Sequence, residues 1–317
     1  MRERTLIQRL LAPIATHSAA RGLLDDAAVL TPPLGRDIVL THDMLAEGIH
    51  FLTDDPPHDI AHKLVAVNLS DLAAMGARPL GLLLGLGLSA REDETWLTAF
   101  TAGLTQACAR WSAPLLGGDT IAGLDKTVLG LTAIGQVAPG QALSRFGARP
   151  GDHLYVTGNI GDAALGLAVA RGGHADASAE TRATLLARYR RPQPRLAFGA
   201  ALIGLATACM DISDGLLIDA DRLTEASRAG ATIELASLPI SRAAEALDAD
   251  PLTLATGGDD YELLFAAPPT RATEVAALAR KLATRVTRVG SVGERAGLTV
   301  LDPGGNPITP DRLGWEH

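Results

Sequence analysis

The sequence predicts a mixed α/β protein built from two domains. The chain has 317 residues, which is more than one hydrophobic core usually serves. Apolar, strand-like runs alternate with segments of helical periodicity along most of its length. A stretch rich in glycine and proline, residues 138–152, has no sustained period and lies near the middle. We therefore expect one domain over residues 1–138 and a second over residues 139–317.

The first domain is predicted to alternate strands and helices after an amphipathic N-terminal helix, "MRERTLIQRLLAPIA". "DIVLTHDML" has the pattern of a strand that runs into a polar turn, and residues 58–76 have helical spacing. "PLGLLLGLGL" is typical of a buried strand, and a helix is expected over residues 92–111. "APLLGGDT" predicts a short strand that ends in a glycine turn, and "KTVLGLTAIGQV" predicts one more strand.

The second domain begins with the predicted strand "HLYVTG" and the helix "IGDAALGLAVARGG". Helices are expected near residues 180–189 and 194–206. The strand "ACMDIS" leads into a helix over "LLIDADRLTEASRAG", followed by the strands "ATIEL" and "YELLFAAP". A helix near residues 272–284 and further strands complete the domain.

The composition is that of a globular protein and excludes several classes. Hydrophobic residues make up 47% and charged residues 20%. The net charge of -8 and the absence of a basic stripe argue against nucleic-acid binding. The N-terminus lacks a signal-peptide core, and no apolar run is long enough to span a bilayer. We expect a soluble cytoplasmic protein without a membrane partner, in which Cys108 and Cys209 are small buried core residues.

Familiar nucleotide-binding and hydrolase motifs do not account for the sequence. Residues 85–90 match G-x-G-x-x-A, but the glycines fall inside a predicted strand, where they would permit close packing. The chain contains neither G-x-x-x-x-G-K-[ST], G-x-S-x-G nor H-E-x-x-H. It also lacks the protein-kinase set of a glycine loop, a strand lysine and H-R-D.

The feature that indicates a function is a recurring set of acids near strand ends and glycine pairs. Taken singly, Asp71 or Asp214 could cap a helix, and His50 could be a solvated turn residue. Together the acids predict Mg²⁺-directed nucleotide chemistry, because carboxylates are the hard ligands that Mg²⁺ prefers and strand ends are where α/β sheets bind ligands. The set comprises Asp25, Asp26, Asp43, Glu47, Asp71, Asp119, Asp211, Asp214, Asp259, Asp260 and Glu262.

The stretch "MDISDGLLIDADRL" crowds four acids beside apolar residues, which costs free energy unless a cation joins them. Asp211 and Asp214 are predicted to lie at a strand-to-helix turn and to face Mg²⁺ and phosphate. Asp221 is expected to be a solvated acid next to Arg222. The position of Asp219, five residues beyond Asp214, fits neither role and stays open.

The ordered motifs "DDAAVL", "THDMLAEGIHF", "AVNLSDLAAMGA", "LLGGDT", "MDISDGLLIDADRL", "GGDDYELLF" and "GWEH" closely resemble the thiamine-monophosphate kinase family of the aminoimidazole ribonucleotide synthetase-like superfamily. The resemblance covers the chain from about residue 20 to the C-terminus. It implies an N-terminal domain that binds ATP and Mg²⁺ and pairs its strands across a homodimer. It also implies a C-terminal α/β domain that completes the active-site cleft.

The resemblance implies a role for each matched position. The metal ligands would be Asp26, Thr41, Asp43, Asp71, Asp119, Asp211 and Asp214. The ATP-binding residues would be Gly118, Asp119, Arg145 and Ser213. The thiamine monophosphate would contact His50, Asp259 and Trp315.

Three positions depart from the family pattern. Leu24 stands where a glycine is usual, which could alter the turn before Asp26. His42 stands where the family usually has Thr or Ser, and a neutral imidazole is a poorer partner for Mg²⁺ than a hydroxyl. Asp259 stands where Glu is common, so that the carboxylate is one methylene shorter.

The resemblance implies the reaction of ATP with thiamine monophosphate to give ADP and thiamine diphosphate. The acceptor phosphate is already largely ionised near neutral pH, so direct in-line transfer needs no strong general base and no phosphoenzyme. Two alternatives remain open from the sequence. One is another ATP-using enzyme of the superfamily, and the other is an inactive protein that binds nucleotide or metal.

Overall fold

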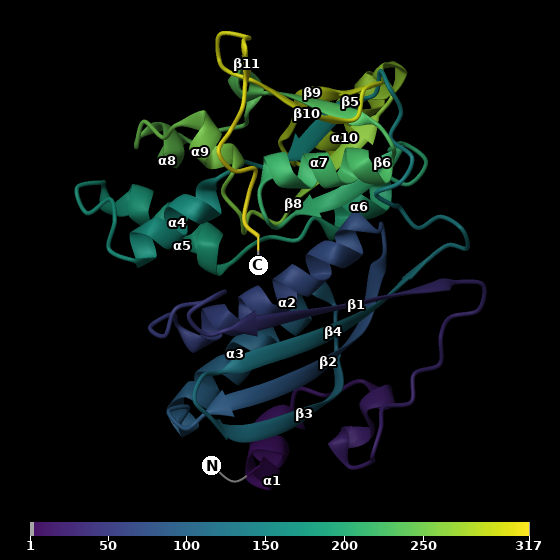
Figure 1. Cartoon of the computed structure of the whole chain (residues 1–317). Helices are drawn as coiled ribbons and strands as arrows, with labels where there is room; N and C mark the ends of the chain where they lie inside the picture. Colours follow the sequence, from purple (N-terminus) through teal and green to yellow (C-terminus); the bar gives the residue numbers. More distant parts are fainter. Residues whose placement is uncertain (1–2, 317) are drawn as a thin grey trace. The chain divides into compact units, whose positions relative to one another are not determined.

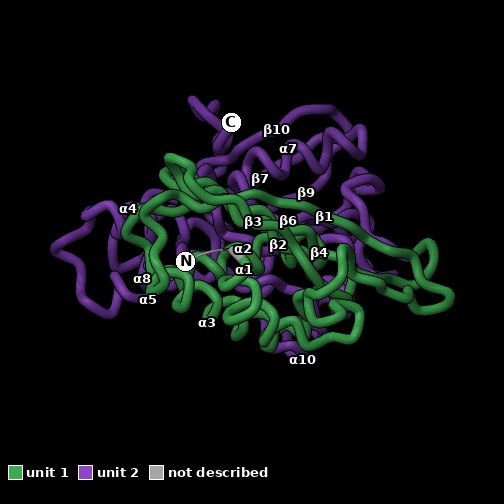
Figure 2. The backbone as a smooth tube through the Cα atoms, turned by 90° about the horizontal axis from the view of Figure 1, so that it is seen from below, with its two compact units in different colours: residues 1–72, 77–140 green, residues 73–76, 141–317 purple. Residues whose placement is uncertain are grey.

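The computed structural model describes residues 3–316, which form two compact units (Figures 1 and 2). Unit 1 comprises residues 1–72 and 77–140, and unit 2 comprises residues 73–76 and 141–317. Among the residues described, no helix has the length and apolar character needed to cross a bilayer.

Unit 1 is built on a four-stranded sheet with the order β1-β4-β2-β3. The strands are β1 (Asp37–Ala46), β4 (Val128–Val137), β2 (Arg78–Ser89) and β3 (Leu115–Leu124). β2 and β3 are parallel, and the other two pairs are antiparallel. A parallel pair needs a crossover, which α3 (Glu94–Trp111) supplies, while α2 (Pro57–Ala74) connects β1 to β2.

The two helices α2 and α3 cover one face of this sheet (Figure 1). Gly103 of α3 lies so close to α2 that a Cβ there would come within 2.3 Å of the His58 carbonyl oxygen. Gly135 of β4 has a similar role, because its Cβ would lie 2.9 Å from the Leu72 side chain. These glycines let the helix layer pack close to itself and to the sheet.

Two details of unit 1 differ from the sequence prediction. The N-terminal helix is short, since α1 (Glu3–Leu6) continues as the π-helical turn η1 (Ile7–Leu11), followed by the 3₁₀ segment η2 (Ser18–Leu23). The glycine turn predicted after "APLLGG" is also wrong. β3 runs straight through Gly117 and Gly118, because both pair with β2 in the sheet.

Unit 2 contains a seven-stranded sheet in which only β10 and β7 are parallel among the paired strands described. Its order is β11 (Pro307–Ile308), β10 (Gly297–Leu301), β7 (Gly230–Glu234), β9 (Val286–Gly293), β5 (His153–Thr157), β8 (Glu262–Ala267) and β6 (Ala208–Ile212). The helical segments are α4 (Asp162–Ala170), α5 (Ala179–Arg190), α6 (Leu196–Ala201), α7 (Leu216–Ala226), η3 (Leu235–Ser237), α8 (Arg242–Glu245), α9 (Pro251–Ala255), η4 (Pro269–Arg271) and α10 (Ala272–Lys281).

Alternating side chains of the central strands build two cores on opposite faces of the unit 2 sheet. Leu154 and Val156 of β5 pack in the cluster that contains the apolar face of α7. Tyr155, between them, packs in the cluster formed with α6 and α10. All six residues of β8 are buried, and its alternate side chains contribute to both cores.

The predictions for the cysteines and for the G-x-G-x-x-A match are confirmed. Cys108 and Cys209 are free thiols and are both buried. Burial raises the pKa of Cys108 to about 11 and raises that of Cys209 further. Gly85 and Gly87 lie within β2, and a Cβ on Gly87 would lie 3.0 Å from the Val128 carbonyl oxygen. The glycines serve strand packing and not a dinucleotide turn.

Candidate functional site

In unit 1, three of the predicted metal ligands lie where β1 meets α2. Thr41 and Asp43 are two residues apart in β1 and therefore point to the same face of the sheet. The Thr41 hydroxyl donates a hydrogen bond to a carboxylate oxygen of Asp71 in α2. Asp71 lies inside the last turn of this helix, so the alternative that it caps a helix N-terminus is wrong. The contact shows that Thr41 and Asp71 can present oxygens together.

A buried amide fixes the same junction and was missed by the sequence analysis. The Asn68 side-chain oxygen accepts the Asp43 backbone N–H at 2.9 Å, and its amide nitrogen donates to the Leu64 carbonyl at 3.0 Å. Asn68 is fully buried and lies one helical turn before Asp71. The signal in the sequence was a polar amide on the otherwise apolar stretch "LVAVNL". Asn68 therefore holds β1 against α2 where Asp43 and Asp71 lie.

His42, the unusual neighbour of Asp43, faces the other side of the sheet. Its Nδ1 lies 2.9 Å from the Thr132 hydroxyl of β4. Because successive strand residues point to opposite faces, His42 cannot take the place of a ligand beside Thr41 and Asp43. The departure at Leu24 has no backbone cost either, since its φ of -104° needs no glycine.

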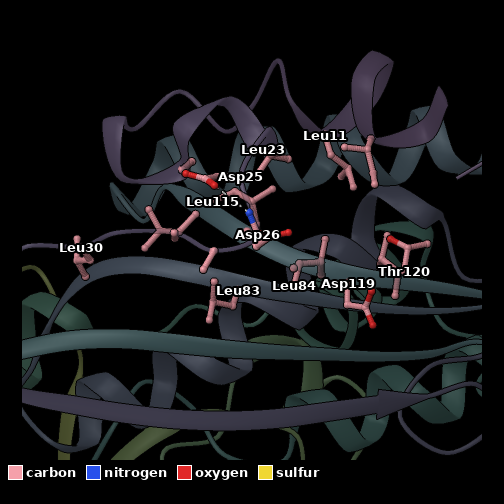
Figure 3. Close-up of a pocket in the computed structure, with 18 of the residues that line it drawn as sticks. Leu11, Leu23, Asp25, Asp26, Leu30, Leu83, Leu84, Leu115, Asp119 and Thr120 are labelled. Atoms are coloured by element: carbon pink, nitrogen blue, oxygen red, sulfur yellow. Dashed lines mark hydrogen bonds between the residues drawn. The ribbon is translucent and has the colours of Figure 1, made fainter. Parts of the chain in front are cut away.

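Asp26, Gly118 and Asp119 line a cavity of about 530 Å³ between the N-terminal segment and strands β2 and β3 (Figure 3). Leucines form much of the remaining lining, and Asp25 is a third acid that lines the same cavity. A Cβ on Gly118 would lie 2.0 Å from the Leu84 carbonyl oxygen, so a glycine is required here for strand packing. Asp119 lies within β3 and not at a glycine turn as predicted, and Asp43 lies within β1, three residues before the end of the strand that it was predicted to end.

His50 is held in one orientation by two backbone contacts. Its Nδ1 accepts the Ala46 N–H at 3.0 Å, and its own carbonyl oxygen accepts from the Lys63 ammonium at 2.9 Å. A ring nitrogen that accepts an N–H cannot carry a proton, so the proton of neutral His50 is on Nε2. His50 lies in a turn and is half-buried, so the alternative of a solvated turn residue stays open, and the ring can act as an Nε2–H donor.

In unit 2, the turn between β6 and α7 is organised by Asp219. One carboxylate oxygen of Asp219 accepts the backbone N–H groups of Ser213, Asp214 and Gly215 at 3.0, 3.1 and 3.3 Å. The other oxygen accepts from Arg222 at 3.0 Å, and Arg222 also pairs with Asp214. Gly215 is the N-cap of α7 and no side chain caps it there, so the alternative that Asp214 caps this helix is wrong. Burial raises the pKa of Asp219 to about 6.

The loop of "GGDDYELLF" runs beside this turn. The Asp259 N–H donates to the Ser213 carbonyl at 2.8 Å, and the Tyr261 N–H donates to the Ile212 carbonyl at 2.8 Å. Asp259 and Tyr261 have φ values of 72° and 50°, which non-glycine residues adopt rarely. Such strained backbone often marks functional loops, and here it brings Asp259 next to Ser213.

The C-terminal segment reaches the same turn. The Trp315 N–H donates to the Asp214 carbonyl at 2.9 Å, and Trp315 is 53% exposed. Gly314 fits only because it has no side chain, since a Cβ would lie 2.6 Å from the same carbonyl oxygen. The unit 2 residues Ser213, Asp214, Asp259 and Trp315 are thus gathered around one turn. Asp211 lies just before it, buried within β6, and not in the turn as predicted.

Arg145 is the one predicted unit 2 residue that lies away from this turn. Its carbonyl oxygen accepts a hydrogen bond from Ser227, which follows the C-terminal end of α7. The 11 residues of α7 span about 16 Å, so the backbone of Arg145 lies at the other end of the helix. Its side chain is exposed.

Three other acids of the motifs form hydrogen bonds and ion pairs within the fold. Glu47 accepts hydrogen bonds from Arg91, Thr53 and the Thr127 N–H. Asp260 is 2% exposed and accepts the Gly161 N–H at 2.7 Å, and burial raises its pKa well above its usual value. Glu262 is also fully buried in a cluster with two arginines. Within residues 3–316, no three His, Cys, Asp or Glu side chains are grouped closely enough to hold a metal by themselves.

Both halves of the chain match domains of one protein family. Residues 24–137 match the N-terminal domain of AIR synthase related proteins, and residues 149–302 match their C-terminal domain. The fold and the paired domains define the chain as a two-domain AIR synthase related protein. Hydrogenase maturation protein HypE, in complex with ATP, shares this fold at 22% identity and a TM-score of 0.79, over 98% of this chain and 95% of that one.

Relatives within the family are more similar. Thiamine-monophosphate kinase of Caulobacter vibrioides is 39% identical over 98% of this chain and 89% of its own length. The same enzyme of Escherichia coli K12 is 40% identical over 93% of this chain and 91% of its own length. The structure of thiamine-monophosphate kinase from Stenotrophomonas maltophilia K279a matches with a TM-score of 0.82 and 39% identity, covering 88% of this chain and 89% of that one. The chain belongs to the thiamine-monophosphate kinase family.

Proposed function

We propose that the protein transfers the γ-phosphoryl group of ATP to the phosphate of thiamine monophosphate, giving thiamine diphosphate and ADP. The observation that carries this is family membership at about 40% identity over nearly the whole chain. A structural relative, AaThiL complexed with AMPPCP and TMP, supports the two substrates at 28% identity and a TM-score of 0.79, covering 99% of this chain and 94% of that one.

The donor set fits Mg²⁺ ions held together with phosphate oxygens. The candidate ligands are all carboxylates apart from one hydroxyl, and such hard oxygen donors suit Mg²⁺, which keeps waters and substrate oxygens in its coordination shell. When bound, the metal would neutralise charge between the two anionic substrates. The residues that would hold it are Asp26, Thr41, Asp43, Asp71, Asp119, Asp211 and Asp214.

The remaining side chains bind and orient the substrates. Ser213 and Arg145 would contact the nucleotide, the latter by pairing with its phosphates. His50 would donate from Nε2, and Asp259 and the exposed Trp315 ring would contact thiamine monophosphate. None of these groups is needed as a nucleophile, because the acceptor phosphate is already ionised. We therefore propose direct in-line transfer without a phosphoenzyme.

The decisive experiment measures thiamine diphosphate directly. Purified protein is incubated with ATP, thiamine monophosphate and Mg²⁺, and the product is oxidised to its fluorescent thiochrome form and separated. We expect stoichiometric thiamine diphosphate and ADP, both abolished by a chelator. ADP formation without thiamine diphosphate would indicate another ATP-using enzyme, and nucleotide binding without turnover would indicate an inactive binding protein.

We also propose that the protein is a homodimer that pairs through the open face of the unit 1 sheet. Three large apolar side chains of β1 are exposed on this face, Ile38 at 40%, Leu40 at 66% and Met44 at 54%. A row of exposed apolar residues on one strand is typical of an interaction surface. Light scattering should give twice the chain mass of 32.9 kDa. Leu40→Lys should give a monomer, whereas Leu34→Lys, at a fully exposed loop residue, should leave a dimer.

A further inference from the structure

The loop that carries Arg145 is attached to unit 2 at both of its ends. The Ser144 carbonyl accepts the Cys209 N–H of β6 at 2.8 Å. The Ser227 hydroxyl donates to the Arg145 carbonyl at 2.9 Å and accepts the Ala148 N–H at 3.1 Å. One serine side chain therefore closes the loop by binding backbone groups on both sides of its tip.

The path of the loop leaves little freedom between these attachments. Gly147 has a φ of 116°, and a Cβ there would lie 2.6 Å from the Thr207 carbonyl oxygen. The backbone therefore passes against its neighbour in a conformation that favours glycine. The Arg145 side chain, by contrast, is exposed. An exposed, charged side chain is thus presented from a backbone held by hydrogen bonds on both sides.

The Ser227 side chain serves this loop and not the helix that it follows. At the end of α7, the Ser227 backbone N–H bonds to the carbonyls of Glu225 and Leu223, which completes the helix without the hydroxyl. Removing the hydroxyl should leave α7 intact and release only the loop. The same helix begins at the turn that Asp219 holds, so α7 connects the Arg145 loop rigidly to the Ser213 turn.

We propose that Ser227 is a positioning residue that fixes Arg145 for binding nucleotide phosphates. The inference rests on the proposed function, in which Arg145 pairs with the phosphates of ATP. Ordering an exposed arginine costs conformational entropy on binding, and a backbone that is already fixed lowers that cost. Among the contacts described, the Ser227 hydroxyl binds only backbone groups of the Arg145 loop, so we expect its effect on binding to pass through Arg145.

The test measures binding of AMPPCP with Mg²⁺ by calorimetry, which does not depend on turnover. Loss of the Ser227 hydrogen bonds in Ser227→Ala should raise the dissociation constant about three- to tenfold. Ser227→Thr, which keeps a hydroxyl, should restore most of the affinity. The matched control is Ser237→Ala, whose hydroxyl contacts only Glu234 among the contacts described and which should bind like the original protein.

A double-mutant cycle with Arg145→Ala separates positioning from a general structural effect. In the Arg145→Ala background, Ser227→Ala should change the dissociation constant less than twofold, and the melting temperature and the KM for thiamine monophosphate should stay the same. An equal loss with and without Arg145 would overturn the proposal, as would unchanged affinity in Ser227→Ala. If the unaltered protein binds AMPPCP but forms no thiamine diphosphate, the proposed function fails and the cycle still decides this inference.

Discussion

Glu262 provides a sharp test of which motif acids are structural. Its carboxylate is fully buried and accepts hydrogen bonds from Thr157 at 2.7 Å, from Arg188 at 2.7 Å and from Arg195 at 2.6 and 2.5 Å. The two arginine side chains are only 21% and 23% exposed, so they cannot simply return to water when the acid is lost. Glu262 therefore neutralises two cations inside unit 2.

The magnitude follows from what each substitution leaves behind. Glu262→Ala leaves two largely buried guanidinium groups without their partner, which should cost about 3–5 kcal/mol. Glu262→Gln keeps the shape and one acceptor, so we expect a loss of about 2–3 kcal/mol from weakened charged hydrogen bonds. Arg188 also approaches Asp162 at 4.0 Å, which offsets part of the cost in both variants.

The assay is hydrogen exchange of β8 amides, which reports the free energy of opening of unit 2 itself. The matched control is Glu274→Gln, which disrupts an exposed pair with Arg271 in the same unit and should cost less than about 1 kcal/mol. A Glu262→Gln variant as stable as this control would refute the reasoning. So would a Glu262→Gln variant of unchanged stability that has lost thiamine diphosphate formation, because Glu262 would then act in the chemistry.

Three further predictions concern the candidate site and the thiols. Asp71→Asn should lower thiamine diphosphate formation on the order of 100-fold or more at limiting Mg²⁺, because it removes a metal ligand. Its unfolding free energy should stay within about 1 kcal/mol, since the amide oxygen can still accept from Thr41. Near-normal turnover would remove Asp71 from the ligand set. Gly314→Ala should raise the KM for thiamine monophosphate several-fold but leave that for ATP unchanged, because its Cβ would lie 2.3 Å from a neighbouring side-chain atom of α7. Equal changes in both constants would contradict this. Cys108 and Cys209 should resist alkylation in the native protein at pH 8, because burial raises their pKa values and the thiolate is the reactive form; rapid labelling measured by mass spectrometry would contradict their burial.

Sequence periodicity predicted most strands and helices because burial patterns are local. The prediction failed in β3, the strand that contains Asp119, because a pair of glycines normally suggests a turn. β3 stays extended through Gly117 and Gly118 since the neighbouring strand β2 pairs with both, and β2 leaves no room for a side chain at Gly118. That cause lies more than 30 residues away in the sequence. The short helices α8 and α9 also escaped the analysis, because segments of four or five residues carry no measurable period.

The candidate site shows the same division between local and distant causes. The motif pattern could identify acids such as Asp71, Asp260 and Glu262, but not which of them is buried against partners. Asp71 meets a hydroxyl at a half-buried junction, whereas Glu262 and Asp260 are enclosed by arginine or backbone N–H groups. Those partners come from other elements, so the distinction exists only after folding. The role of Asn68 could not be predicted either, because its side chain binds the backbone of β1, which lies beside it only in the folded protein.

Other groups of the chain offset the repulsion between the acids that follow β6, without a metal ion. The Asp219 carboxylate accepts hydrogen bonds from three backbone N–H groups of the turn, which stabilise its negative charge. Arg222 then neutralises Asp219 and Asp214 together. In the sequence, Arg222 is only the neighbour of Asp221, an acid expected to be solvated. In the structure, Arg222 is the cation that stabilises the two acids of this turn. Because Arg222 and Mg²⁺ would bind the same carboxylate, Asp214 must exchange one cation for the other if it is a metal ligand, and its affinity for Mg²⁺ is set by that competition.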